Sequence, residues 1–114
     1  ILDYAKACEA LAWADASTAW FVNQSNVSSA TSAAAMPRAA ALALFGGPRE
    51  GLAWGAKHGQ SRAVRVEGGY RLTGTWSFAS GGRHTRLLGA HSAVQNEDGT
   101  PHIRHGRPDD RSFV

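Results

Sequence analysis

Residues 68–81 combine aromatic and hydroxyl side chains with small residues, in the order Gly-Gly-Tyr-Arg-Leu-Thr-Gly-Thr-Trp-Ser-Phe-Ala-Ser-Gly. The pattern predicts a glycine turn, then an alternating strand, then a serine hydroxyl between small residues. Because Ala79, Ser80 and Gly81 leave the backbone almost uncovered, a planar ligand could approach the main chain there. We therefore expect a ligand-binding turn where the strand ends.

Two interpretations are open for the side chains of this segment. In a strand from Tyr70 to Phe78, Trp76 and Phe78 share one face with Tyr70 and Leu72. Aromatic residues in strands mostly bury apolar area, so core packing accounts for this stripe as well as ligand contact does. The hydroxyl of Ser80 could cap a turn or bind a ligand, and its place within the whole string favours the ligand.

Composition and charge limit the classes of function. The chain has 114 residues, of which 43% are hydrophobic and 18% charged, as is ordinary for a small globular protein. Before Pro48 the sequence has two basic and three acidic residues, and from Pro48 on it has ten basic and six acidic residues. The second half should therefore prefer anionic ligands. Its Arg and Lys residues are scattered, without clustered aromatic residues, which argues against a nucleic-acid partner.

The sequence also carries signals of compartment. The single cysteine, Cys8, cannot form an internal disulfide, which fits a cytoplasmic location, and we expect it to be a buried thiol. No apolar run approaches the roughly 20 residues of a membrane span, and no secretory signal opens the sequence. Because the chain starts at Ile1 within a helical pattern and stops at what resembles the start of a strand, we expect a fragment.

Residues 1–47 predict helices. The alanine-rich start has helical spacing, and Asp15 offers an N-cap for a second helix, which runs into a polar stretch from Asn23 to Ser32. A third, short helix should follow Pro37 and end at Gly46 and Gly47.

Residues 48–114 predict β-structure. Short apolar alternations occupy 52–56, 63–66, 70–78 and 87–94, with a last one near Ile103. Glycines in Glu67-Gly68-Gly69 and in Asn96-Glu97-Asp98-Gly99 predict two turns. The predicted fold is thus α+β, with N-terminal helices (1–47) followed by an antiparallel sheet or partial barrel (48–114).

The order of helices and then strands, together with the segment from Val66 to Val94, resembles the acyl-CoA dehydrogenase superfamily. Within it, the chain is most similar to the flavin-dependent monooxygenase branch, the oxygenase components of two-component aromatic hydroxylases. A Gly-x-Trp-x-Phe-x-Ser-Gly string recurs in that branch, and here it comprises Gly74, Trp76, Phe78, Ser80 and Gly81. The segment 14–20 also looks like the family's helical segment. The resemblance implies the end of an N-terminal helical domain and a middle β-domain, without the C-terminal helical bundle.

By this resemblance the cofactor is a flavin, FAD or FMN. In dehydrogenase members an aromatic, an aliphatic and a threonine line the flavin, and the matching positions here are Phe78, Ala79 and Ser80. Serine keeps the hydroxyl that can bond the N5 edge, and the resemblance adds Gly81, Trp76 and Trp54 as further contacts. Phe78 in place of tryptophan favours the hydroxylase branch. No catalytic residue is assigned, because the dehydrogenase base belongs to the absent bundle.

Three functions stay open from the sequence. The leading one is hydroxylation of a small aromatic-type substrate with oxygen and reduced flavin from a separate reductase. The alternative is α,β-dehydrogenation of an acyl thioester with FAD, and a homotetramer is implied for the full-length protein in both cases. A third is a non-catalytic relic or interaction module, since this chain alone should be inactive. His102 and His105 have ligand-like spacing but lack a second cluster, so we predict no metal site.

Overall fold

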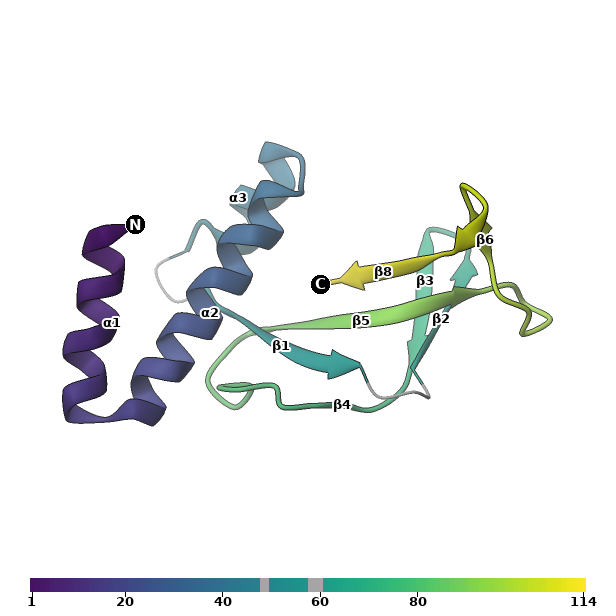
Figure 1. The fold of residues 1–114 in the computed structure, drawn as a ribbon. Helices are drawn as coiled ribbons and strands as arrows, with labels where there is room; N and C mark the ends of the chain where they lie inside the picture. Colours follow the sequence, from purple (N-terminus) through teal and green to yellow (C-terminus); the bar gives the residue numbers. More distant parts are fainter. Residues whose placement is uncertain (48–49, 58–60) are drawn as a thin grey trace. The chain divides into compact units, whose positions relative to one another are not determined.

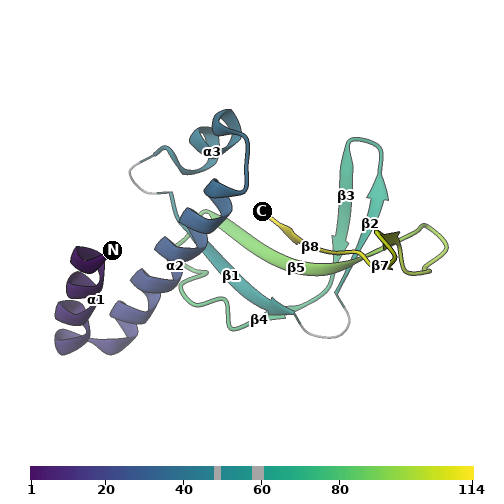
Figure 2. The same ribbon diagram turned by 45° about the horizontal axis from the view of Figure 1, so that its top comes forward.

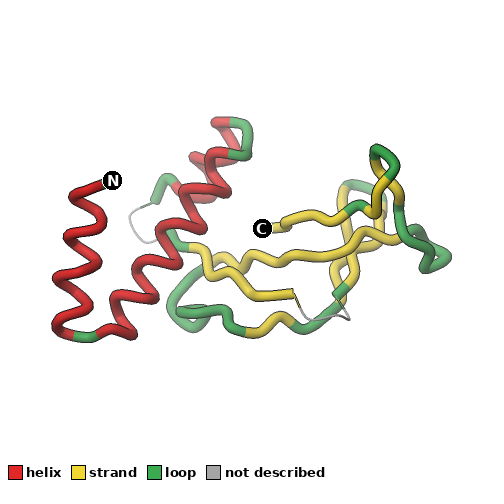
Figure 3. Tube along the Cα trace, in the orientation of Figure 1, coloured by secondary structure: helices red, strands yellow, loops and turns green. Residues whose placement is uncertain are grey.

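The structure, a computed structural model of the 114-residue chain, describes residues 1–47, 50–57 and 61–114. Three helices come first (Figure 1), and their bounds are α1 Leu2–Ala14, α2 Ala16–Ala34 and α3 Arg38–Phe45. Strands make up most of the remainder, which confirms the predicted α+β class (Figure 3).

A single residue separates α1 from α2. Asp15 has extended backbone angles (φ −157°, ψ 109°), and its Oδ1 accepts a hydrogen bond of 2.7 Å from the amide of Thr18. This is the predicted N-cap, which satisfies one of the amides that a helix start leaves unpaired. The chain reverses there, so α1 packs alongside α2, and the hydroxyl of Tyr4 donates to Asn23. Cys8 in α1 is half-buried. The pKa of Tyr4 is raised, mainly because Tyr4 loses solvent and secondly through its hydrogen bond with Cys8.

The polar stretch of α2 stays helical as far as Ala34. Ser29 Oγ donates to the carbonyl of Ser25 at 2.7 Å, and Thr31 Oγ1 donates to that of Val27 at 2.8 Å. Hydroxyls that can compete with helical hydrogen bonds are thus bonded back onto the preceding turn. Ser29 Oγ also accepts from the amide of Leu52 at 3.2 Å.

The strands form a mixed sheet. Within the described residues six strands join in the order β3-β2-β5-β1-β4, with β8 pairing β5 as well, and β6 pairs β7 in a separate ribbon. The long strand β5 is plain in Figure 2. The bounds are β1 Leu52–Lys57, β2 Arg62–Val66, β3 Gly69–Thr73, β4 Trp76–Ser77, β5 Leu87–Gln95, β6 Ile103–Arg104, β7 Arg107–Pro108 and β8 Asp110–Phe113.

Both predicted turns are present. Val66 pairs with Gly69 across a two-residue hairpin, where Gly68 has φ +78°. Gly99 has φ +85° in the second turn, and the amide of Asn96 donates to Thr100 O at 2.9 Å. The β2–β5 pair is parallel, so the sheet is mixed instead of wholly antiparallel.

The segment predicted as one strand from Tyr70 to Phe78 is two strands. Tyr70 and Leu72 are half-buried in β3 while their neighbours are exposed, as predicted. The chain then leaves β3 at Gly74, where an added Cβ would lie 2.8 Å from Ser61. Only glycine permits that close approach of two backbones, and it ends the alternation that the sequence suggested.

Two compact units make up the chain. The helical unit comprises residues 1–54 and 80–88, and the sheet unit comprises 55–79 and 89–114. Fully buried Leu52 and nearly buried Ala19 lie in the helical unit, and Ala63 and Val94 lie in the sheet unit. The domain division at 47/48 stays a prediction. No helix among the described residues is both long and apolar enough to span a membrane.

Candidate functional site

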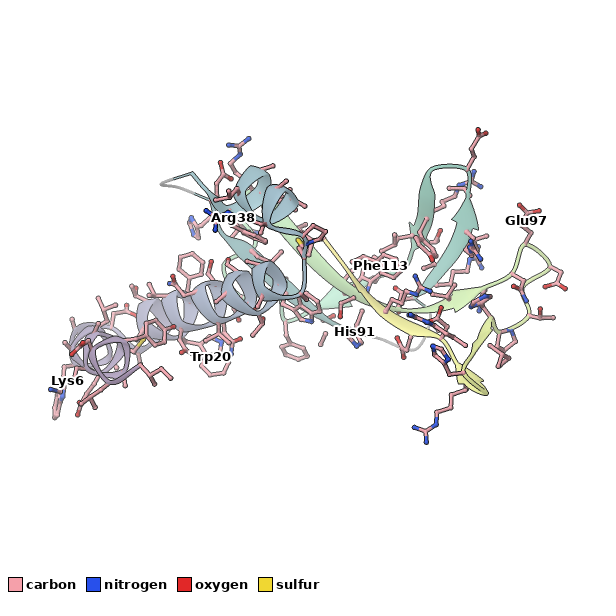
Figure 4. The ribbon with its side chains drawn as sticks, turned by 90° about the horizontal axis from the view of Figure 1, so that it is seen from above. Lys6, Trp20, Arg38, His91, Glu97 and Phe113 are labelled. Atoms are coloured by element: carbon pink, nitrogen blue, oxygen red, sulfur yellow. The ribbon has the colours of Figure 1, made fainter. Side chains whose placement is uncertain are left out.

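Ser80 lies in the helical unit and accepts a hydrogen bond through its side chain. Trp20 Nε1 donates to Ser80 Oγ at 3.0 Å, and Figure 4 shows Trp20 projecting from α2. Ser80 is half-buried, while Trp20 is 57% exposed. The serine oxygen therefore lies neither in packed hydrocarbon nor free in water, and the indole bond leaves its hydroxyl hydrogen unused.

Gly81 has a structural reason to be glycine. Its φ is +77°, and a Cβ at this position would overlap the ring of Phe21. The amide of His84 donates to Gly81 O at 2.7 Å and closes the turn, while the His84 ring lies 5.8 Å from that of Phe21. Packing alone accounts for this glycine, so its backbone contact with a cofactor stays a prediction.

The C-terminal part of residues 80–88 is tied to the two residues that precede β1. The amide of Leu87 donates to Gly51 O at 3.3 Å, and Arg86 forms a 2.7 Å ion pair with Glu50. Thr85 Oγ1 is buried and has no hydrogen-bond partner among the described residues. The contacts of Arg86 and Leu87 hold the C-terminal end of the segment that presents Ser80.

Trp76, in the sheet unit, has the features of a packing residue. It is half-buried, and its Nε1 donates to the carbonyl oxygen of His91 in β5 at 2.9 Å (His91 is labelled in Figure 4). An added Cβ on Gly55 would meet Trp76 Cβ at 2.5 Å, and one on Gly74 would meet the far edge of the indole at 3.2 Å. Of the two interpretations of the aromatic stripe, core packing fits Trp76.

Phe78 differs sharply from Trp76. Its φ is +57°, and the residue is 82% exposed. A bulky residue in the left-handed region is a genuine outlier that costs about 1–2 kcal/mol, and such strain concentrates at functional sites. The large apolar ring is thus held outward at an energetic cost, immediately before the half-buried Ala79. The exposed ring is available for contact with a flat ligand.

Trp54 lies in β1 and is half-buried. Its placement neither supports nor opposes contact with a cofactor. Pro48 and Arg49, which precede that strand in the sequence, lie outside the described residues.

A polar cluster that the sequence did not indicate lies in the sheet unit. Asp109, 5% exposed, accepts from Arg111 Nε at 2.9 and 3.1 Å and lies 3.1 Å from His102 Nδ1. Arg111 Nη1 donates to the hydroxyl of Tyr70 at 2.7 Å, and the ring of Tyr70 meets that of Phe113 edge-on. The Arg111 hydrogen bond holds the pKa of Asp109 below its usual value despite burial, and Asp109 in turn raises the pKa of Arg111.

Within this cluster Asp109 pairs with Arg111 and His102, so we interpret the cluster as structural. His102 contacts a carboxylate, and no group of three metal-ligating side chains occurs in the described part of the chain. In the sequence, the charged run Asp109-Asp110-Arg111 is the signal that could have indicated this cluster. Arg111 comes near Tyr70 through the pairing of β8 with β5, which the sequence does not display.

A surface hollow of about 470 Å³ lies in the helical unit, where α2 meets α3. Residues such as Met36, Leu42 and Phe45 line it, and none of the predicted cofactor contacts does.

Comparison with known proteins gives one informative likeness. No protein-family model matches the sequence, and no curated protein matches it. Among solved structures the chain is similar to XiaF from Streptomyces sp., solved in complex with FADH2 and glycerol. The two are 36% identical with a TM-score of 0.63, over 75% of this chain but only 22% of XiaF. The chain therefore spans less than a quarter of that protein's length, and the likeness agrees with the α+β fold described above.

Proposed function

We propose that the chain is part of a flavin-dependent oxidoreductase, with the segment from Trp76 to Gly81 against the flavin ring. The observation that carries the proposal is Phe78, an exposed aromatic ring on a strained backbone. Two residues later in the sequence, Ser80 has a hydroxyl hydrogen that its tryptophan partner does not use. The likeness to XiaF, whose structure holds FADH2, supports a flavin as the ligand.

The residues present suit a flavin chemically. Its ring system is flat and apolar over its faces and carries hydrogen-bonding atoms along its edge. Phe78 offers an aromatic surface, Ala79 adds little bulk, and Ser80 offers a donor. Trp76 supports this segment from within the sheet unit, where its indole bonds His91 O. Gly81 and Trp54 complete the set of proposed contacts.

When bound, the flavin would supply the electrons for the reaction. The residues of this chain would bind the ring, fix the orientation of its edge through Ser80, and exclude water from one side through Phe78. No carboxylate of the chain is assigned as a base.

For the reaction, we propose hydroxylation of a small aromatic-type substrate with oxygen and reduced flavin, in a full-length protein that works with a separate reductase. The reduced flavin in XiaF favours this over dehydrogenation of an acyl thioester, which starts from oxidised flavin. In the full-length protein, which we propose to be a cytoplasmic homotetramer, oxygen uptake with reduced flavin is expected. Reduction of a dye by acyl thioesters would indicate the dehydrogenase instead.

Binding of the cofactor is the first test. Titration of the chain into FAD, and separately into FMN, should quench or shift flavin fluorescence with saturation. Phe78→Ser should weaken this binding, whereas Leu88→Ser, at another exposed apolar residue (62%), should not. A well-folded chain that leaves both flavins unchanged would contradict the proposal and favour a non-catalytic module.

A further inference from the structure

The hydrogen bond between Trp20 and Ser80 can run in one direction only. An indole N–H donates and cannot accept, so Ser80 Oγ must be the acceptor in the 3.0 Å contact. A serine hydroxyl carries a single hydrogen, and this bond does not use it. The rotation of that hydrogen about the Cβ–Oγ bond is then restricted to directions away from the indole.

We propose that Trp20 is a positioning residue, which fixes the Ser80 hydroxyl so that its hydrogen points to an acceptor on the flavin edge. The inference rests on the proposed function and deepens it, because it makes Ser80 a donor. The carbonyl oxygen beside N5 is an acceptor in both redox states of the flavin, and the N5 lone pair is a second acceptor in oxidised flavin, whereas N5 of reduced flavin carries a hydrogen. Trp20 itself would act through Ser80 and need not contact the cofactor.

The placement of Trp20 supports a role beyond packing. It is 57% exposed in the second turn of α2, so it buries little of its ring for so large a side chain. Its bond spans 60 residues of sequence, and both partners belong to the helical unit. An exposed indole contributes little to the core, whereas its directional N–H sets the orientation of a hydroxyl.

The chain offers a matched control. Trp13, in α1 of the same unit, is 86% exposed, so Trp13→Phe makes the same chemical change on a similarly exposed helical surface. Trp20→Phe keeps an aromatic ring and removes the donor, and Ser80→Ala removes the hydroxyl.

The test is an FAD titration of the wild-type chain and of Trp20→Phe, Ser80→Ala, the double variant and Trp13→Phe. We expect Trp20→Phe and Ser80→Ala each to weaken FAD binding about threefold to tenfold, the range of one hydrogen bond. The double variant should be no weaker than Ser80→Ala, and Trp13→Phe should equal the wild type. In the flavin-free chain, the Trp20 indole N–H resonance should shift in Ser80→Ala.

The outcomes separate the two proposals. If the wild-type chain binds no FAD, the proposed function fails and the positioning role with it. If the wild type binds FAD but Trp20→Phe does so equally well, or the two losses multiply in the double variant, the positioning role alone is overturned. An unshifted indole resonance in Ser80→Ala would overturn it without any flavin.

Discussion

Two tryptophans, Trp76 in the sheet unit and Trp20 in the helical unit, use the same indole donor in opposite ways. Trp76 donates to a backbone carbonyl at 2.9 Å, is half-buried and lies against two glycines. Trp20 donates to the Ser80 side chain at 3.0 Å and is mostly exposed. The Trp76 bond links two strands of the sheet, whereas the Trp20 bond constrains a side-chain hydroxyl. The acceptor and the exposure of an indole donor, more than the residue type, therefore separate a packing residue from a candidate binding residue.

A substitution of Gly81, the residue after Ser80, should lower the free energy of unfolding more than the other changes below. Gly81→Ala would place a methyl group in the Phe21 ring at positive φ, so we expect a loss of about 2–4 kcal/mol in the free energy of unfolding. Gly68→Ala is the control, since it has a similar φ but open space around it, and should cost about 1–2 kcal/mol. Urea denaturation measures both, and equal losses would show that Phe21 does not constrain this turn.

The tryptophan pair tests the comparison directly. Trp76→Ala removes a half-buried ring and leaves the His91 carbonyl without its indole partner, so we expect a loss of about 2–3 kcal/mol. Trp20→Ala should cost less than about 1 kcal/mol, as is usual for exposed side chains. Thermal unfolding of the two variants side by side provides the measurement. A larger loss at Trp20 would reverse the assignment of the two roles.

Phe78 should show a trade between stability and binding. Asparagine tolerates the left-handed conformation better than phenylalanine, so Phe78→Asn should raise the free energy of unfolding by about 0.5–1 kcal/mol. The same variant should lose affinity for FAD. Phe78→Leu keeps the apolar character and the strain, and should give no such gain. Destabilisation by Phe78→Asn would mean that the ring is held for packing.

Acid should have the smallest effect on the free energy of unfolding, because its effect on the sheet unit is confined to low pH. The pKa of Asp109 is below its usual 3.8 in the folded chain, mainly through its hydrogen bond from Arg111. A lowered folded pKa means that this group's stabilisation is complete above pH 3.8 and is lost as the pH falls through the lower folded value. Urea denaturation from pH 6 down to pH 2 should show that decline. Asp109→Asn should remove this part of it, and identical profiles would contradict the role of the carboxylate.

Much of the fold could be predicted from local signals. Asp15 as a cap, Gly68 in a two-residue turn and the alternation of Tyr70 with Leu72 act over a few residues, so the sequence displays them. Pairing between distant segments has no such signature. The parallel β2–β5 pair and the close approach of Gly74 to Ser61 depend on which segments meet, and local periodicity does not encode that.

The candidate site shows the same division. The string around Ser80 pointed to a ligand-binding turn, and Phe78 carries the exposure and strain suited to one. The left-handed φ of Phe78 could not be foreseen, because phenylalanine in an alternating pattern predicts ordinary strand geometry. Trp20 as the partner of Ser80 was also hidden, although it ends the helical segment 14–20 that resembles the family.

The double use of the Ser29 hydroxyl has a consequence for chimeric proteins. It donates to its own helix at Ser25 O and accepts from the amide of Leu52, a residue with no exposed surface. A graft that exchanges helix α2 but keeps the native strand must carry serine or threonine at position 29. Alanine at position 29 would leave the buried amide of Leu52 without this acceptor, so positions 29 and 52 should be transferred together.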